Sequence, residues 1–289
     1  EQIVKNIILE YVKNLENLPA FPEVSMSIMK VLQDDQTGLN EAVAVIKKDP
    51  SLTMRILKVA NSAKYGGTMK VTALEVAAGR LGVKMLRQLA LVDSVMNLFP
   101  ESSSGYDSRS FWEHSLCTAC VSEALIKKLR ENPNFYLPKP LECFTASLIH
   151  GVGMLVLQLG FSKSTARIVQ YMKDEGLPLY ETEMQLIGIS NPECGEILCE
   201  YWHMPELIKL AVRWHLTPNE APEDARALCE FIYMSKYIAL HQTINESIFT
   251  SDSLKYFPEV FEKYGLDGLS EEEIQSIADN SLENSLSII

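Results

Sequence analysis

The sequence predicts an all-α protein, and three observations lead to this prediction. Apolar residues recur at three- and four-residue spacing along much of the 289-residue chain, as they do on the buried face of a helix. Capping residues and prolines stand between these segments, where helices begin and end. The sequence contains no convincing alternating run of the kind that indicates a β-strand. We expect a helical bundle of two packed helical subdomains with no sheet.

Helix-breaking residues divide the N-terminal part into a series of expected helices. Asp49 followed by Pro50 is a typical helix start, because the carboxylate caps free backbone N–H groups and proline suits the first turn. Thr72 to Glu75 has the capping-box pattern, which predicts another start, and a glycine junction follows at 79–82. The expected helices cover residues 3–18, 22–32, 40–48, 50–60, 72–79 and 82–99, with turns or loops at 34–38 and 61–67.

The C-terminal part begins after the serine-rich stretch Ser102–Gly105, which is the best internal boundary. A long helix over about 107–130 is expected next, and an apolar central helix over 144–161 follows it. Ser190–Glu193 has the capping-box pattern and predicts a further helix start. The other expected helices cover 165–173, 180–185, 190–202, 205–215 and 223–241, and an acidic amphipathic segment with a capping box at 270–273 follows residue 251.

The apolar stretch from 144 to 161 contains no Asp, Glu, Lys or Arg, yet it contains His150. Its length of about 18 residues approaches the minimum that crosses a bilayer. Three polar residues and two interrupting glycines argue against a membrane span; the polar ones are Thr145, Ser147 and Gln158. A helix that is apolar on every side otherwise forms the centre of a large soluble core. We expect one central helix, with His150 pointing into the cavity of the domain.

The composition limits the partners and the compartment. Acidic residues outnumber basic ones by 38 to 26, and the net charge of −12 disfavours a nucleic-acid surface, which needs clustered Lys and Arg. The densest basic stretch, Lys127–Arg130, ends an expected helix, where cations complement the helix dipole. Six irregularly spaced cysteines and the lack of a visible signal peptide indicate reduced thiols in the cytoplasm.

Three of the five histidines lie in segments whose apolar faces should converge, namely His114, His150 and His215. Three imidazoles can hold one transition-metal ion. A mid-helix histidine among apolar neighbours is more often a hydrogen-bonded core residue, and we favour that interpretation. Cys117 and Cys120 form a Cys-x-x-Cys, but a structural zinc site usually needs a second pair of ligands, so we interpret both as core residues.

Six stretches of the chain stand in an order that matches a known family. They are Leu18-Pro-Ala-Phe-Pro22, Asp49–Leu52 with Arg55–Ser62, Ala77–Gly82, Phe111–Ser115, Leu148–Gly153 and Trp202–His215. Together they resemble the HDOD family, the "HD-related output domain" of bacterial signalling proteins. The resemblance implies an HD-like helical domain over 18–240 with subdomains at about 18–100 and 107–240, an N-terminal helix at 1–17 and an acidic helical extension at 241–289.

The resemblance also implies which residues occupy the positions of a metal site. HD phosphohydrolases, whose helical core is similar, carry a His-Asp pair on the central helix, and this pair supports a two-metal centre that activates water. In this chain His114 and His150 stand at the first two histidine positions and His215 at a late one. Gly151 replaces the aspartate, and glycine has no side chain with which to bridge metal ions.

Two further positions depart from the hydrolase pattern. Asn191 stands near the place of another histidine, although it or the pair at 190 and 193 also explains helix capping. Lys236 stands where another aspartate is expected, and its charge would repel metal ions. Imidazoles alone are poor ligands for Mg²⁺ or Mn²⁺, which prefer oxygen. We expect no metal, no cofactor and no catalytic residue, and a residual binding pocket formed by His114, His150, Asn191, His215 and Lys236.

Three functional hypotheses follow. The first is a non-catalytic regulatory domain of signal transduction that binds an unidentified signalling protein. The second is a metal-dependent phosphohydrolase with a degenerate site. The third is a domain whose residual pocket binds a small ligand without turning it over. Neither a nucleic acid nor a membrane is expected as a partner.

Overall fold

The computed structural model describes residues 10–12, 14, 18–21, 38–67, 69–99, 107–130, 132, 134–241, 254 and 256–286. Every regular element within these residues is a helix, so the expected all-α class is confirmed. The chain forms two compact units, a smaller one of Pro19–Pro100 with Leu286–Ile289 and a larger one of Glu1–Leu18 with Glu101–Ser285. The expected helices at 3–18 and 22–32, the turn at 34–38 and the boundary at 102–105 lie wholly or largely outside the described residues.

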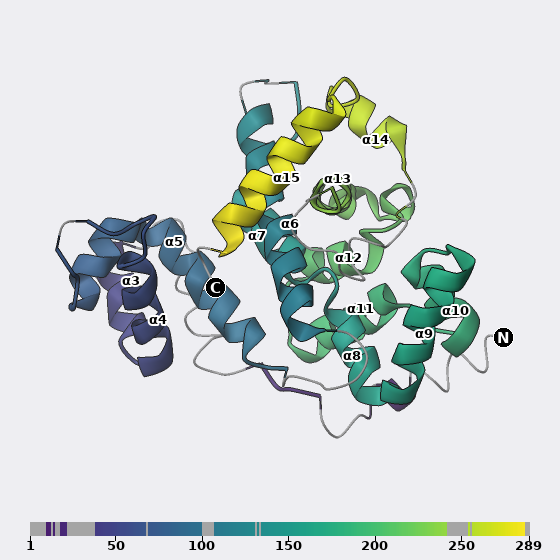
Figure 1. The fold of residues 1–289 in the computed structure, drawn as a ribbon, viewed down its shortest axis with the longest axis horizontal. Coiled ribbons are helices and arrows are strands. Elements are labelled where there is room, and N and C mark those ends of the chain that lie inside the picture. The colour runs from purple at the N-terminus through teal and green to yellow at the C-terminus, as the bar shows by residue number, and fades with distance from the viewer. Residues whose placement is uncertain are drawn as a thin grey trace. The chain divides into compact units, whose positions relative to one another are not determined.

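The smaller unit packs α3 (Leu39–Ile46) and α4 (Pro50–Ala60) against α5 (Leu74–Met96) (Figure 1). The predicted start of α4 is confirmed, because the Asp49 carboxylate accepts a hydrogen bond from the backbone N of Leu52 at 3.0 Å. This bond satisfies one of the backbone donors that a helix start leaves free.

The start of α5 differs from the prediction. Its N-cap is Ala73, which has no side-chain cap, so the capping box expected at Thr72 is wrong. The carboxylate of Glu75 forms an ion pair with Lys47 at the end of α3 instead. The predicted junction is confirmed, since α5 is interrupted at Gly82, where φ is 77° and ψ is 163°. Glycine enters this region of positive φ without steric cost.

The loop between α4 and α5 is held by Asn61 and Arg80. Asn61 Nδ2 donates to the carbonyl of Val71 and Asn61 Oδ1 accepts from the backbone N of Val71, both at 2.8 Å. Arg80 donates to the carbonyl of Ala60 at 3.0 Å. Both residues lie in stretches that resemble the known family, and their contacts here shape the loop.

We expect Asn61→Ala to lower the free energy of unfolding of the smaller unit by about 2–3 kcal/mol. The substitution removes the two bonds to Val71 and a third to the carbonyl of Leu57 at 2.8 Å, and each such bond contributes about 1 kcal/mol. Asn40→Ala is the matched control, because Asn40 is exposed and its loss should change stability by less than about 0.5 kcal/mol. Urea unfolding followed by circular dichroism measures both, and equal losses would contradict the role of Asn61.

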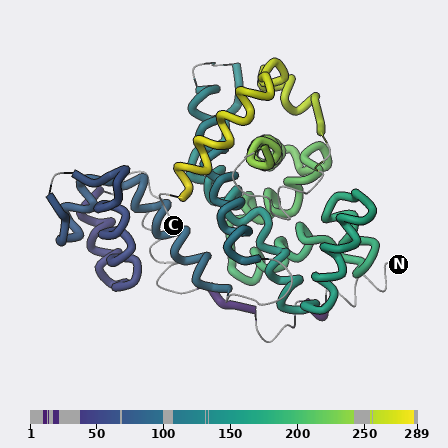
Figure 2. The backbone as a smooth tube through the Cα atoms, viewed as in Figure 1, coloured from purple at the N-terminus to yellow at the C-terminus, as the bar shows by residue number. Residues whose placement is uncertain are grey.

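The larger unit contains the histidines that the sequence singles out. α13 packs against α6, α7 and α12, and α11 packs against α8 and α12 (Figure 2). The start of α6 is as predicted, because Asp107 accepts from the backbone N of Ser110 at 2.9 Å. The elements are α6 (Ser108–Leu129), α7 (Pro140–Ile149), α8 (Val152–Gly160), α9 (Ser162–Glu175), α10 (Leu179–Ile187), α11 (Asn191–Tyr201), α12 (Glu206–Trp214), the 3-10 helix η1 (Pro218–Glu220), α13 (Glu223–Ala239), α14 (Pro258–Lys263) and α15 (Glu271–Leu286).

The expected central helix is interrupted, which corrects the prediction of one continuous helix. The chain leaves the helix at Gly151, where φ is −95° and ψ is 5°, so α7 ends with His150 as its C-cap and α8 begins at Val152. The segment Pro140–Gly160 is long and apolar enough to cross a membrane, but 89% of its apolar window is buried inside the structure. This burial is typical of a core segment.

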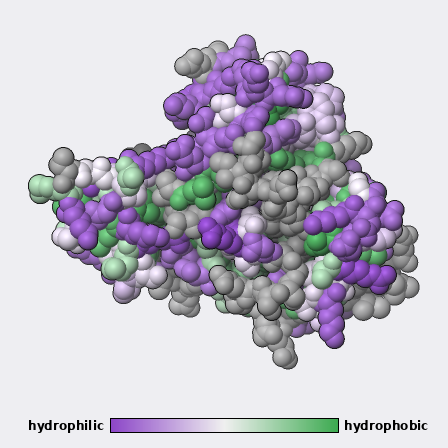
Figure 3. Space-filling model, in the orientation of Figure 1, coloured by the Kyte–Doolittle hydropathy of each residue, from purple (hydrophilic) through white to green (hydrophobic). Residues whose placement is uncertain are grey.

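The C-terminal segment is attached to α13 by a buried carboxylate. Glu230 accepts from Lys263 Nζ at 2.8 and 2.6 Å and from the Tyr264 hydroxyl at 2.7 Å. The predicted capping box of α15 is confirmed, since Ser270 N donates to Glu273 at 2.9 Å and Glu273 N donates to Ser270 Oγ at 3.2 Å. Hydrophilic side chains cover the outer face of α15 (Figure 3).

Candidate functional site

The three histidines come together in the core of the larger unit. His114 lies on α6, His150 ends α7 and His215 ends α12, and each is at most 2% exposed. The ring centres of His114 and His150 are 5.7 Å apart, and those of His150 and His215 are 5.0 Å apart. His150 therefore contacts both of the other rings.

Backbone carbonyls fix the protonation of two of these rings. Nδ1 of His150 lies 2.6 Å from the carbonyl oxygen of Ser147, and Nδ1 of His215 lies 2.8 Å from that of Val212. A carbonyl oxygen can only accept, so each Nδ1 carries a proton and donates it. Nε2 of each neutral ring then holds a lone pair. Nε2 of His215 is buried and has no hydrogen-bond partner among the described residues.

Burial is the largest cause of a lowered pKa at all three histidines. Burial, together with the charge of Lys236, lowers the pKa of His150 to about 3. For His114 and His215 burial is followed by the charge of His150 and then by that of Lys236, and the pKa of both lies well below the ordinary value. Lys236 lies on α13, which packs against the helices that carry the rings. At neutral pH three uncharged imidazoles therefore share their surroundings with one ammonium group.

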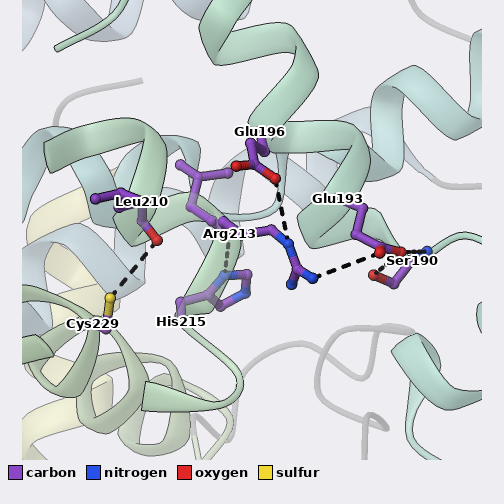
Figure 4. A network of polar contacts seen from close by, with 8 residues as sticks. Ser190, Glu193, Glu196, Leu210, Arg213, His215 and Cys229 are labelled. Atoms are coloured by element: carbon purple, nitrogen blue, oxygen red, sulfur yellow. Dashed lines mark hydrogen bonds and ion pairs between the residues drawn. The ribbon is translucent and has the colours of Figure 1, made fainter. Parts of the chain in front are cut away.

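An ion-pair network holds the end of α12 beside His215 (Figure 4). The Arg213 guanidinium lies 3.6 Å from Glu193 and 3.4 Å from Glu196, both on α11. Its central carbon also lies 4.2 Å from the ring centre of Trp214. These contacts attach α12 to α11 and so position His215. The sequence carries no motif for Arg213, because its partners are on another helix.

Asn191, which stands near an expected histidine position, forms hydrogen bonds with a carboxylate. Its backbone N and its side-chain Nδ2 both donate to Glu183 at 2.7 Å. The cap of α11 is Ser190, whose backbone N donates to Glu193 at 3.0 Å, so the capping interpretation holds for this pair. Glu183 is completely buried. No sequence pattern identifies it, since its partner belongs to the following helix.

An aromatic ring crowds the position of the missing aspartate. A Cβ added to Gly151 would lie 3.1 Å from Cε2 of Phe111 and 3.8 Å from the sulfur of Met154. Phe111 is 1% exposed and cannot move into solvent without opening the core. A carboxylate at position 151 therefore requires the Phe111 ring to be displaced.

The residues of this site do not fit the two-metal centre of a hydrolase. Among the described residues, no three His, Cys, Asp or Glu side chains are arranged to hold a metal ion. The cluster offers imidazole nitrogens next to an ammonium group, whereas Mg²⁺ and Mn²⁺ prefer oxygen ligands. The geometry therefore supports no step that depends on such an ion.

The Cys-x-x-Cys is part of the core, as interpreted from the sequence. All six cysteines are buried thiols. Cys117 donates to the carbonyl of Ala278 at 3.7 Å, and burial raises the pKa of the Cys117 thiol. A thiol with a raised pKa is a weak nucleophile and metal ligand, because the thiolate is the reactive form.

Comparison with known proteins gives a consistent family and fold. The sequence model of the HDOD domain matches residues 18–218. The structure of an HDOD domain protein with unknown function from Geobacter sulfurreducens gives a TM-score of 0.76 at 20% identity, covering 98% of this chain and 96% of that chain. A candidate phosphohydrolase from Shewanella amazonensis SB2B gives a TM-score of 0.69 at 21% identity over 96% and 98% of the two chains.

Two further relatives are longer than this chain. A candidate signal transduction protein from Marinobacter aquaeolei VT8 gives a TM-score of 0.79 at 19% identity, covering 99% of this chain and 64% of that chain. An uncharacterised protein of Treponema pallidum (strain Nichols) is 20% identical over 214 residues, which are 74% of this chain and 40% of the relative. At these identities the solved structures establish a shared fold.

Proposed function

The chain belongs to the HDOD family, and from this membership we propose that it is a non-catalytic regulatory domain of signal transduction that acts by binding a protein partner or a small ligand. The observation that carries the proposal is the lost aspartate position, where Gly151 supplies no carboxylate and Phe111 Cε2 lies 3.1 Å from a Cβ built there. A two-metal centre needs a bridging carboxylate at this place.

The state of the histidines supports the same conclusion. A general base works best when its pKa lies near the working pH, whereas the pKa of His150 is about 3 and those of His114 and His215 are well below the ordinary value. Lys236 adds a positive charge where the hydrolases carry an aspartate. The cluster is therefore suited to holding the core together and to binding, and poorly suited to activating water.

The partner and the compartment are part of this proposal. We place the domain in the cytoplasm, because six buried cysteines that remain thiols suit a reducing compartment. The net charge of −12 disfavours nucleic acid. The partner is an unidentified signalling protein, and the alternative is a small ligand bound by the histidines, Asn191 and Lys236.

A phosphohydrolase with a degenerate site is the second candidate. It is favoured by the spacing of the rings, because two imidazoles on one tetrahedral ion have ring centres about 5 Å apart. The observed separations of 5.7 and 5.0 Å are close to this value. The two candidates differ in whether the cluster takes up metal and turns over a phosphoester.

We expect no metal-stimulated hydrolysis of p-nitrophenyl phosphate or bis(p-nitrophenyl) phosphate by the wild-type chain. Mg²⁺, Mn²⁺, Co²⁺ and Zn²⁺ are added in turn, and p-nitrophenolate release is followed by absorbance. His150→Ala and Gly151→Asp should give the same background rate, the latter because Phe111 crowds the new side chain and Lys236 still opposes the binding of a metal ion. A metal-dependent wild-type rate that His150→Ala abolishes would establish the hydrolase instead.

A further inference from the structure

We propose that the ammonium group of Lys236 takes the place of a metal ion beside His114, His150 and His215 and thereby keeps transition metals out of this cluster. The proposal rests on the proposed non-catalytic function and names the residue that maintains it. In this proposal the three histidines could bind a metal ion, and the positive charge of Lys236 prevents them from doing so.

Two of the three rings make the backbone contact that metal-binding histidines commonly make. A ligating histidine donates its other ring N–H to a carbonyl or carboxylate, which fixes the lone pair on the metal side. His150 and His215 make this contact through Nδ1 to Ser147 and Val212, at 2.6 and 2.8 Å. Nε2 of His215 is left as a buried lone pair with no hydrogen-bond partner in the described part of the chain.

α13 carries Lys236 and packs against the helices that carry the three rings. These helices are α6, which contains His114, and α7 and α12, which end at His150 and His215. Lys236 is 8% exposed, so water screens its charge only weakly. A cation in this position repels any second cation that approaches the rings.

The effect of Lys236 on protons shows the direction of its effect on metals. Its charge contributes to the lowered pKa of each of the three histidines, although burial is the larger cause. A group that disfavours the addition of one positive charge to these rings disfavours a divalent ion more strongly, because the Coulomb energy scales with the charge. The same principle predicts that removal of the ammonium opens the cluster.

The test compares Lys236→Met with Lys236→Arg. Methionine keeps an apolar stem of similar length in the buried position, whereas arginine keeps the charge. Each variant and the wild type are incubated with Co²⁺, desalted and analysed for bound metal and for the visible absorption of cobalt bound by nitrogen ligands. We expect about one Co²⁺ per chain in Lys236→Met, since three imidazoles suit this ion, and background metal in the wild type and in Lys236→Arg. Adding His150→Ala to Lys236→Met should return the metal to background.

The outcomes separate the role of Lys236 from the proposed non-catalytic function. A folded Lys236→Met that binds no Co²⁺ would overturn the role of Lys236 and leave the non-catalytic function intact. Equal binding by Lys236→Arg would overturn the charge argument. Metal in the wild type would overturn both this inference and the metal-free site of the proposed function. Circular dichroism checks folding, and Lys236→Gln replaces Lys236→Met if the methionine variant does not fold.

Discussion

Gly153→Ala is expected to destabilise the larger unit by more than about 4 kcal/mol, which is an exceptional loss for one methyl group. A Cβ at this position would lie 1.8 Å from the carbonyl oxygen of Asn191 and 2.5 Å from the backbone N of Gly195. Both atoms belong to the backbone of α11 and cannot rotate away. The variant must therefore separate α8 from α11, and urea unfolding or a loss of soluble protein will show this.

Gly79→Ala is the matched control for this prediction. Gly79 lies within α5, and nothing approaches a Cβ built there within 4 Å. Alanine in a helix interior is favoured over glycine by about 1 kcal/mol, so this variant should be at least as stable as the wild type. A Gly153→Ala variant with wild-type stability would show that the two helices do not meet as closely as described.

Acid is expected to unfold the larger unit through the three histidines. Their pKa in the folded state lies below the ordinary value of 6.5, and for His150 it is about 3. Below pH 6.5 the unfolded chain thus binds more protons than the folded chain, so the free energy of unfolding falls as the pH falls. The contribution is complete above about pH 6.5 and decreases towards pH 3. Each histidine contributes up to about 1.4 kcal/mol per pH unit, or about 4 kcal/mol for the three together.

A pair of histidine variants isolates this effect from the titration of carboxylates. His150→Gln should reduce the dependence of stability on pH between 6 and 4 by about one proton. His241→Gln is the control variant, because His241 is exposed at the end of α13. Urea unfolding is measured at several pH values for both variants and the wild type. The same slope in His150→Gln and the wild type would exclude a neutral buried His150.

The helix starts show which parts of the fold the sequence predicts. Asp49 and Asp107 cap their helices as predicted, because each bond joins residues only three apart in the chain. The prediction at Thr72 is wrong because Glu75 pairs with Lys47, which the chain brings close only after folding. The helix starts at Asp49 and Asp107 depend on local geometry, whereas Glu75 near the start of α5 takes part in a contact between helices.

The sequence likewise predicts some features of the candidate site and not others. The convergence of His114, His150 and His215 follows from apolar faces that the sequence displays. The ring of Phe111 beside Gly151 does not, because it depends on how α6 crosses the break between α7 and α8. Only the packed structure shows that a side chain at position 151 would be crowded by the Phe111 ring.

The carboxylate of Glu230 determines where a stable fragment of this domain can end. The match to the family model ends at residue 218, before the helix that carries Glu230 and Lys236. A fusion or fragment cut after α13 would strand Glu230, 3% exposed, without Lys263 and Tyr264, and a buried charge deprived of its partner is strongly destabilising. A fragment or fusion that keeps the partners of Glu230 therefore has to extend through α15.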